Sequence, residues 1–278
     1  MNIFQAINKE YVSKDILKKT LDLLKIYDTD YLYIHTAMSF GMPNPQLGRK
    51  KILEEIFNVF QEFKIKNICF PTFTFSFCNG ESYNVQESKS KMGTLNEYAR
   101  MLPNAVRSVD PLMSSVLIGE EIDLVKNISK SSIGKDSTFD KLHNKERVKF
   151  LFFGTKVGDC FTYMHYIEKM VNSSYRYDRI FEGQITDGLN TYNDAYDLFV
   201  RYKDIYAGDG SYVYEQMMID RGISKRLEVG DSTITVLDEF NAYELYYDLI
   251  SKTPNYFLDP KSIFTFDKTF KVKNMVAL

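Results

Sequence analysis

Residues 150–168 read FLFFGTKVGDCFTYMHYIE, and this stretch indicates the class of fold. The run at 150–153 is apolar and rich in β-formers, which is typical of a buried strand. Beyond it, Met164, Ile167 and Val171 recur at helical spacing. The sequence therefore predicts a strand that leads through a polar loop into a helix.

The same alternation runs along the rest of the chain. Strands are predicted at 31–35, 68–70, 116–118, 150–154 and 233–237. Helices are predicted at 13–26, where Ser13 is the N-cap, and at 47–64, 120–129, 192–206 and 241–251. Strands separated by helices indicate an α/β fold, and we expect residues 1–278 to form a single layered domain.

Composition excludes several classes of function. Lys and Arg total 35 against 37 Asp and Glu, and a net charge of −2 lacks the basic excess of a general nucleic-acid binder. No apolar run approaches the ~18 residues of a membrane span, and residues 1–10 lack the order of a signal peptide. Three cysteines (Cys69, Cys78 and Cys160) are too few for a disulfide scaffold. We expect a cytoplasmic protein with neither a nucleic-acid nor a membrane partner.

Polar clusters follow three of the predicted strands, at 35–41, 71–76 and 154–168. Ligand sites of α/β sheets gather where strands end and loops begin. Hydroxyls beside backbone N–H groups at such places hold phosphate or carbonyl oxygens. The alternative is that these Ser and Thr residues only cap helices and turns.

The chain has only three histidines, which narrows the search for a general base. His143 lies in a charged stretch that we expect to be solvated, and His35 ends a buried strand. His165 is the most suggestive, because Thr162, His165 and Glu168 are three residues apart and form one polar line on a helix. A carboxylate one turn away orients the ring and raises its basicity, although an exposed His/Glu pair with no catalytic role has the same spacing.

Several signatures of other enzymes are missing. The chain has no Gly-x-x-x-x-Gly-Lys-Ser/Thr, no Gly-x-Gly-x-x-Gly after a strand, no Gly-x-Ser-x-Gly and no His-Glu-x-x-His. The sequence therefore lacks the usual motifs of P-loop hydrolysis, Rossmann dinucleotide binding, α/β-hydrolase chemistry and zincin proteolysis. The cysteines show no metal-ligand spacing, and we expect no metal.

Taken in order, these segments resemble the aminoglycoside 3-N-acetyltransferase family from about Val12 to Gly183. The matching segments are HT at 35–36 (His-Ser-Ser), PTFT at 71–74, MG at 92–93, RSVDPLMS at 107–114 (Arg-Ser-x-His-Pro-x-x-Ser), TYMHYIE at 162–168 (Thr-x-x-His-x-x-Glu) and YRY at 175–177. The resemblance implies a central mixed β-sheet flanked by helices, not a GCN5-like fold. It also implies acetyl-CoA as the acyl donor.

Three departures from the family pattern are Asp110 in place of the motif histidine, Ala37 in place of the second serine, and Phe161 in place of the motif asparagine. The first departure puts aminoglycosides in doubt. The resemblance extends to bacterial enzymes that acylate nucleotide-linked 3-amino-3,6-dideoxy sugars for surface polysaccharides such as lipopolysaccharide O-antigen. We therefore expect a dTDP-linked amino sugar as acceptor. The alternatives are an aminoglycoside and a non-catalytic relative that binds CoA or a sugar.

The resemblance and the local chemistry together assign roles to named residues. His165 is the expected base, oriented by Glu168, while Asp110 holds the amine or shares in its deprotonation. Direct transfer is preferred over an acyl-enzyme on Cys160. The expected CoA contacts are His35, Thr36, Ser39, Thr72, Thr74, Ser108 and Ser114, and the expected acceptor contacts are Tyr83, Tyr175, Arg176 and Arg179. The sequence leaves open the role of Arg107, the length of the acyl chain, the configuration of the sugar and the oligomeric state, for which a homodimer is one option.

Overall fold

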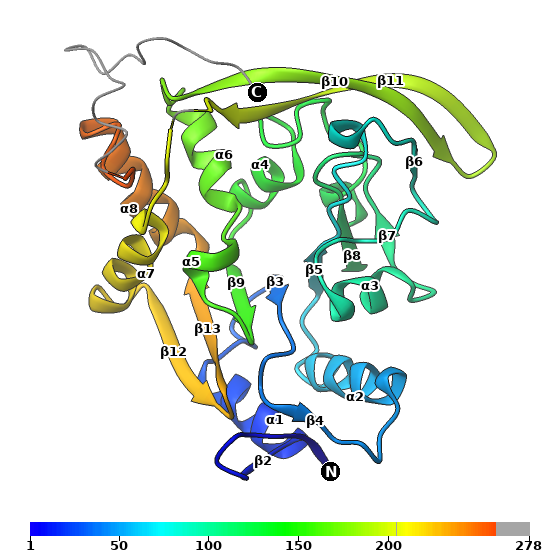
Figure 1. The fold of residues 1–278 in the computed structure, drawn as a ribbon, viewed down its shortest axis with the longest axis vertical. Coiled ribbons are helices and arrows are strands. Elements are labelled where there is room, and N and C mark those ends of the chain that lie inside the picture. Colours follow the sequence, from blue (N-terminus) through cyan, green and yellow to red (C-terminus); the bar gives the residue numbers. More distant parts are fainter. Residues whose placement is uncertain (204, 260–278) are drawn as a thin grey trace.

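The structure is a computed structural model that describes residues 1–203 and 205–259 (Figure 1). The predicted 1–278 domain and the predicted 192–206 helix both include residues outside these ranges. Within the described residues, every helix is too short or too polar to cross a bilayer.

A seven-stranded sheet forms the centre of the molecule. Its strands in spatial order are β12 (Ser224–Val229), β13 (Ser232–Asp238), β9 (Val148–Phe153), β3 (Tyr31–Thr36), β5 (Asn67–Pro71), β8 (Ser115–Gly119) and β7 (Val106–Arg107). Strand β3 runs parallel to β5 and β9, and the remaining neighbours are antiparallel. The expected mixed sheet is therefore confirmed.

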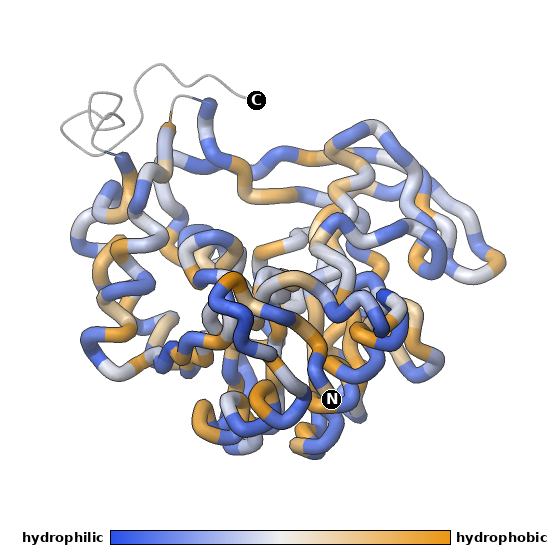
Figure 2. Tube along the Cα trace, turned by 60° about the horizontal axis from the view of Figure 1, so that its bottom comes forward, coloured by the Kyte–Doolittle hydropathy of each residue, from blue (hydrophilic) through white to orange (hydrophobic). Residues whose placement is uncertain are grey.

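Side chains of the central strands alternate between the two faces of the sheet. On β9, Leu151 and Phe153 pack into one buried cluster, while Phe150 and Phe152 pack into the other. The first cluster is covered by α1 (Lys14–Leu23), α2 (Arg49–Gln61) and α3 (Thr94–Arg100). The second is covered by α4 (Thr138–His143), α5 (Val157–Cys160), α6 (Tyr163–Met170), α7 (Gly210–Asp220) and α8 (Glu239–Lys252). Figure 2 shows hydrophobic segments running through the interior strands and hydrophilic ones along the outer helices and turns.

The strongly periodic segments fold as predicted. Helix α1 begins after Ser13, whose Oγ accepts a hydrogen bond from the N–H of Ile16 at 3.2 Å, so the predicted N-cap is confirmed. Helices α2, α6 and α8 and strands β3, β5, β8, β9 and β13 also lie where the sequence placed them. Elements without a prediction are β1 (Asn2–Gln5), β2 (Tyr11–Ser13), β4 (Met42–Pro43), η1 (Phe77–Asn79), β6 (Tyr83–Asn84), β7, α3, α4, α5, β10 (Arg176–Asp187), α7 and β12.

The helix predicted at 192–206 is wrong, because most of this segment is a strand. Strand β10 (Arg176–Asp187) pairs antiparallel with β11 (Asn190–Arg201) over the full length of both strands. Buried Tyr196 and Phe199 are three residues apart, and this spacing imitates a helical stripe. Asp187 and Asn190 are joined by a two-residue turn in which Gly188 has a φ of +60°, as a tight hairpin requires. The hairpin extends along one end of the molecule (Figure 1).

The helix predicted at 120–129 is also wrong, since only a short 3₁₀ turn forms there, η2 (Ile122–Leu124). The side-chain oxygen of Asn67 accepts hydrogen bonds from the N–H groups of Glu120 and Glu121, at 3.1 and 2.9 Å. These bonds hold the chain to the end of β5 and keep it from starting a helix. At the other end, Asn127 has a φ of +53°, which is outside the helical region.

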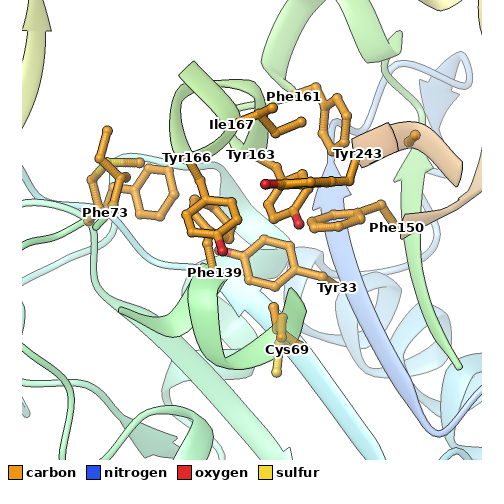
Figure 3. Packing of buried hydrophobic residues seen from close by; sticks show 14 of the residues in the cluster. Tyr33, Cys69, Phe73, Phe139, Phe150, Phe161, Tyr163, Tyr166, Ile167 and Tyr243 are labelled. Carbon is orange, nitrogen blue, oxygen red and sulfur yellow. The ribbon is translucent and has the colours of Figure 1, made fainter. Parts of the chain in front are cut away.

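Aromatic packing fixes α6 against the sheet. The ring centroids of Tyr163 and Phe150 are 4.9 Å apart, and Phe161 meets Phe150 edge-on at 5.1 Å. Figure 3 shows these rings together with Phe139 and Tyr166 from the same cluster. One face of α6 is thereby buried, and the polar face is left for the opposite side of the helix.

Candidate active site

A pocket of about 380 Å³ lies beside the polar face of α6. Helix α6 contributes His165 and Glu168, the open end of the hairpin contributes Arg176 and Arg201, and α8 contributes Tyr246. The volume falls in the range typical of small-molecule sites. Residues from four separate elements therefore converge on one cavity.

The predicted histidine–carboxylate pair is present in this pocket. Nδ1 of His165 lies 2.8 Å from Oε2 of Glu168. The His165 side chain is 37% exposed, whereas that of Glu168 is 6% exposed. The ring is therefore open to a ligand, while the carboxylate is enclosed behind it.

Glu168 is surrounded by donors. Its Oε1 accepts hydrogen bonds from the hydroxyls of Tyr175 (2.7 Å) and Tyr246 (3.2 Å), and Nε of Arg176 lies 2.7 Å from Oε2. Burial alone raises the pKa of this carboxyl, but Arg176, followed by His165 and Tyr175, outweighs burial and lowers the pKa to about 2. Glu168 is therefore ionised at neutral pH.

His165 is shifted in the direction that suits a base. Burial, followed by the charge of Arg176, lowers its pKa below the usual 6.5, and the hydrogen bond to Glu168 opposes this shift. The ring is therefore neutral near pH 7 and has a nitrogen lone pair available for a proton.

The structure places two of the predicted acceptor contacts beside this base. Tyr175 and Arg176 line the pocket; Tyr175 donates a hydrogen bond to Glu168, and Arg176 forms an ion pair with it. The other two do not line it. Tyr83 is buried and donates to the carbonyl of Ser108 at 2.9 Å, and Arg179 lies over the ring of Phe181 with its guanidinium carbon 4.9 Å from the centroid.

Asp110 does not line the pocket of His165. Its Oδ1 accepts hydrogen bonds from the N–H groups of Leu112 (2.8 Å) and Met113 (3.0 Å) and from the hydroxyl of Ser132 (2.9 Å). The side chain is buried, and burial raises its pKa. In this structure Asp110 holds together the loop before β8.

Four of the hydroxyl residues predicted to contact CoA are buried inside the neighbouring loops. Thr72 donates to the carbonyl of Ser114 at 3.1 Å, and Ser114 donates to the carbonyl of Thr72 at 2.7 Å. Thr74 donates to the carbonyl of Pro111, and the hydroxyl of Ser108 accepts from a backbone N–H. Because these side chains are almost completely buried, they stabilise the loops and do not reach the pocket surface.

Arg107, whose role the sequence left open, braces the same loops. Its Nη2 donates to the carbonyl of Thr72 at 2.7 Å, and its Nη1 donates to the carbonyls of Val85 (3.1 Å) and Ser88 (2.6 Å). The side chain is buried, so its donors serve the protein backbone.

The remaining predicted CoA contacts lie together at the end of β3. Thr36 bonds to the side chain of Asn96, and exposed Ser39 bonds to the carbonyl of Gly154. His35 is buried and stacks on Phe152 with ring centroids 5.0 Å apart. Burial lowers the pKa of His35 to about 3, so this histidine is neutral.

Several residues that line the pocket were given no role from the sequence, Thr162 and Arg201 among them. Thr162 Oγ1 is buried and has no hydrogen-bond partner among the described residues. Arg201 reaches the pocket because it is paired in register with Arg176, and the incorrect helix prediction concealed this pairing. Cys160 also lines the pocket, and burial raises the pKa of its thiol to about 12. The sequence indicated only the position of Thr162, which is three residues before His165 and therefore on the same face of the helix.

Metal chemistry has no candidate centre in residues 1–203 and 205–259, where no group of three or more His, Cys, Asp or Glu side chains is arranged to hold an ion.

Comparisons with known proteins point to one family. A family model described as aminoglycoside 3-N-acetyltransferase matches residues 68–249, well over half of the chain. A search of curated proteins finds no match.

Solved structures with the same fold include aminoglycoside acetyltransferase AAC(3)-Xa, with a TM-score of 0.74 and 17% identity over 87% of this chain and 93% of that one. The sisomicin-bound AAC-VIa gives a TM-score of 0.73 and 15% identity over 87% of this chain and 98% of that one. The binary complex of AAC-IIIb with CoASH gives a TM-score of 0.72 and 15% identity over 87% of this chain and 97% of that one. At these identities the similarity shows a shared fold.

Proposed function

Because this chain belongs to the aminoglycoside 3-N-acetyltransferase family, we propose that it transfers an acetyl group from acetyl-CoA to a primary amine of an amino sugar. The observation that carries this proposal is the partly exposed ring of His165, paired with buried Glu168 in a pocket of ligand size. The pair lies within the Thr-x-x-His-x-x-Glu motif, at Thr162, His165 and Glu168.

His165 acts as the general base in this proposal. An amine similar to an α-amino group has a pKa of about 7.7–8.0, so much of it is protonated near neutrality and must lose a proton to react. Nε2 of the ring accepts that proton while Nδ1 donates to Glu168, whose charge stabilises the imidazolium. The C–N bond forms, the C–S bond breaks, and the CoA thiolate leaves and takes up the second proton that the nitrogen loses on becoming an amide.

The residues present fit the thioester end of acetyl-CoA. Thr162 Oγ1 is a buried polar atom without a partner among the described residues, and its place in the pocket suits the carbonyl oxygen, which gains negative charge during attack. Thr36 and Ser39, at the end of β3, are the proposed contacts for the rest of the CoA arm, with His35 behind them. Acetyl-CoA supplies the activated acyl group.

Direct transfer is favoured over an acyl-enzyme on Cys160. The thiolate is the nucleophilic form of cysteine, and a pKa of about 12 leaves very little thiolate at neutral pH. Cys160 Sγ lies 3.7 Å from the hydroxyl of Thr155 and 3.6 Å from the carbonyl of Lys156. Its hydrogen-bonding contacts therefore do not include His165.

The comparisons favour an aminoglycoside as acceptor. The family model carries that substrate in its name, and one structural neighbour is a complex with sisomicin. Asp110, the residue that put an aminoglycoside in doubt, is buried in a loop and does not line the pocket of His165, so it does not exclude this acceptor.

A second candidate acceptor is a dTDP-linked 3-amino-3,6-dideoxyhexose, and the charges in the pocket favour it. Arg201 lines the pocket and makes no hydrogen bond or ion pair with another described side chain. The two carboxylates that line the pocket are engaged, because Glu168 pairs with Arg176 and Asp159 accepts from Tyr212. A guanidinium that has no side-chain partner among the described residues suits an anionic diphosphate better than a polycation.

A paired assay tests the proposal and separates the acceptors. Release of the CoA thiol is followed with acetyl-CoA and either sisomicin or a dTDP-linked 3-amino-3,6-dideoxyhexose, with the His165→Asn variant as control. We expect release with at least one amine, and the preferred amine identifies the acceptor. No release across a broad panel of amines would overturn the proposal and would support a non-catalytic CoA- or sugar-binding relative. A cytoplasmic location and a homodimer remain predictions from the sequence.

A further inference from the structure

One guanidinium touches both members of the His165–Glu168 pair. Nε of Arg176 lies 2.7 Å from Oε2 of Glu168, and Nη2 lies 2.8 Å from Nδ1 of His165. The third nitrogen, Nη1, donates to the carbonyl of Phe199 at 3.1 Å. The Arg176 side chain is only 9% exposed, and it is held by two hydrogen bonds, through Nη1 and Nη2, and by the ion pair of Nε with Glu168.

These contacts set up a competition at a single ring nitrogen. Nδ1 lies 2.8 Å from an oxygen that can only accept and 2.8 Å from a guanidinium nitrogen that can only donate. When Nδ1 carries a proton, it donates to Glu168, and its N–H then faces the N–H of Arg176, so that two donors meet without an acceptor. When Nδ1 has a lone pair it accepts from Arg176, and the ring proton is then on Nε2, so this tautomer cannot take the amine proton on Nε2 as the proposed mechanism requires.

We propose that Arg176 is a positioning residue that competes with Glu168 for Nδ1 of His165, and so sets which ring nitrogen carries the proton. The inference rests on the proposed role of His165 as base. Glu168 favours the imidazolium, which has no lone pair to accept a proton from the amine. Burial and, after it, Arg176 oppose this effect and favour the neutral ring.

Other charged groups around the ring have smaller or opposite effects. Arg201 on β11 also lowers the pKa of His165, but ranks below Arg176 and has no contact with Nδ1. The remaining titratable groups that face the pair or line the pocket are Tyr175, Tyr246, Asp159 and Cys160. The contact geometry therefore distinguishes Arg176 from its neighbours, and Arg201 provides a matched control.

Nitrogen NMR of protein labelled with ¹⁵N-histidine measures the effect directly. The chain has three histidines, and the His165→Asn variant assigns the signals of His165. In Arg176→Gln we expect the ring proton to move toward Nδ1 and the pKa of His165 to rise by about one unit or more. Arg176→Lys keeps the positive charge but loses the fork, so the proton should move toward Nδ1 with a smaller rise in pKa. Arg201→Gln should leave the distribution of the proton unchanged.

The acid limb of kcat/KM against pH should shift upward with the pKa in Arg176→Gln. An unchanged distribution of the ring proton in both Arg176 variants would overturn the inference. Because the NMR readout needs no turnover, it remains valid even if His165→Asn retains activity and the proposed role as base fails. If Arg176→Gln does not fold, Arg176→Lys decides the question, with a thermal melt to check its integrity.

Discussion

His165–Glu168 and His143–Glu239 are paired over nearly the same distance, with Nδ1 2.8 Å and 2.9 Å from a carboxylate oxygen. The surroundings of the two pairs differ. His165 lines the pocket and meets Arg176, whereas His143 stacks on Tyr243 with ring centroids 3.9 Å apart.

The carboxylate of the second pair is committed to the core. Glu239 is 1% exposed, and it accepts a hydrogen bond from Tyr163 as well as its contact with His143. This cluster ties α4 and α8 to the buried face of α6. A histidine–carboxylate contact is therefore a candidate base only when the ring opens onto a cavity. The His143–Glu239 pair instead holds α6, the helix that carries His165, in place.

The largest expected difference between the two regions is in turnover. His165→Asn should reduce kcat by about 10²- to 10⁴-fold, the usual contribution of base catalysis. His143→Asn should leave kcat close to wild type, because its ring does not line the pocket. Thiol release at saturating acetyl-CoA measures both. Equal losses in the two variants would remove the distinction drawn between the pairs.

Acid stability should depend on Glu168. A folded pKa of about 2 against the usual 4.5 corresponds to about 3 kcal/mol of stability. Because the folded pKa is depressed, this contribution is complete above pH 4.5 and is lost as the pH falls toward 2. The advantage of wild type over Glu168→Gln in urea unfolding should therefore be larger at pH 7 than at pH 3. A constant difference between the two pH values would show that Glu168 titrates normally.

Two matched tyrosine substitutions distinguish a residue that only stabilises the fold from one that also affects the catalytic pair. Tyr163→Phe removes a donor to Glu239 and should cost about 1–3 kcal/mol in the free energy of unfolding, with little change in kcat. Tyr175→Phe removes a donor to Glu168 and should change the pH dependence of kcat/KM as well as stability. Urea unfolding and pH profiles of both variants test this. A large loss of kcat in Tyr163→Phe alone would contradict the assignment of catalysis to His165–Glu168 and would point to His143–Glu239.

The sequence predicted what depends on local geometry. Residues three apart on a helix share a face whatever surrounds them, so the contact between His165 and Glu168 could be foreseen. Short apolar runs rich in β-formers likewise placed β3 and β9 in the sheet. In both cases the interacting residues are close in sequence or follow a simple period.

Contacts between distant segments were missed. His143, expected to be solvated, is held by Glu239, which is 96 residues away. Arg201 reaches the pocket only through its pairing with Arg176 across a hairpin, where the spacing of Tyr196 and Phe199 suggested a helix. The loop role of Asp110 was equally hidden, because one of its donors is Ser132. Such partners depend on tertiary packing, which a single sequence does not reveal.

The smallest expected effect is at Cys160, the cysteine closest in sequence to His165. A pKa of about 12 instead of the usual 9.0 lowers its thiolate fraction by about a thousandfold, so Cys160→Ala should keep kcat close to wild type. N-ethylmaleimide should label exposed Cys78 well before Cys160. Mass spectrometry of the labelled peptides and thiol-release kinetics give both results. Loss of turnover in Cys160→Ala, together with an acetylated Cys160 peptide, would replace direct transfer with an acyl-enzyme and reduce His165 to the activator of a thiol.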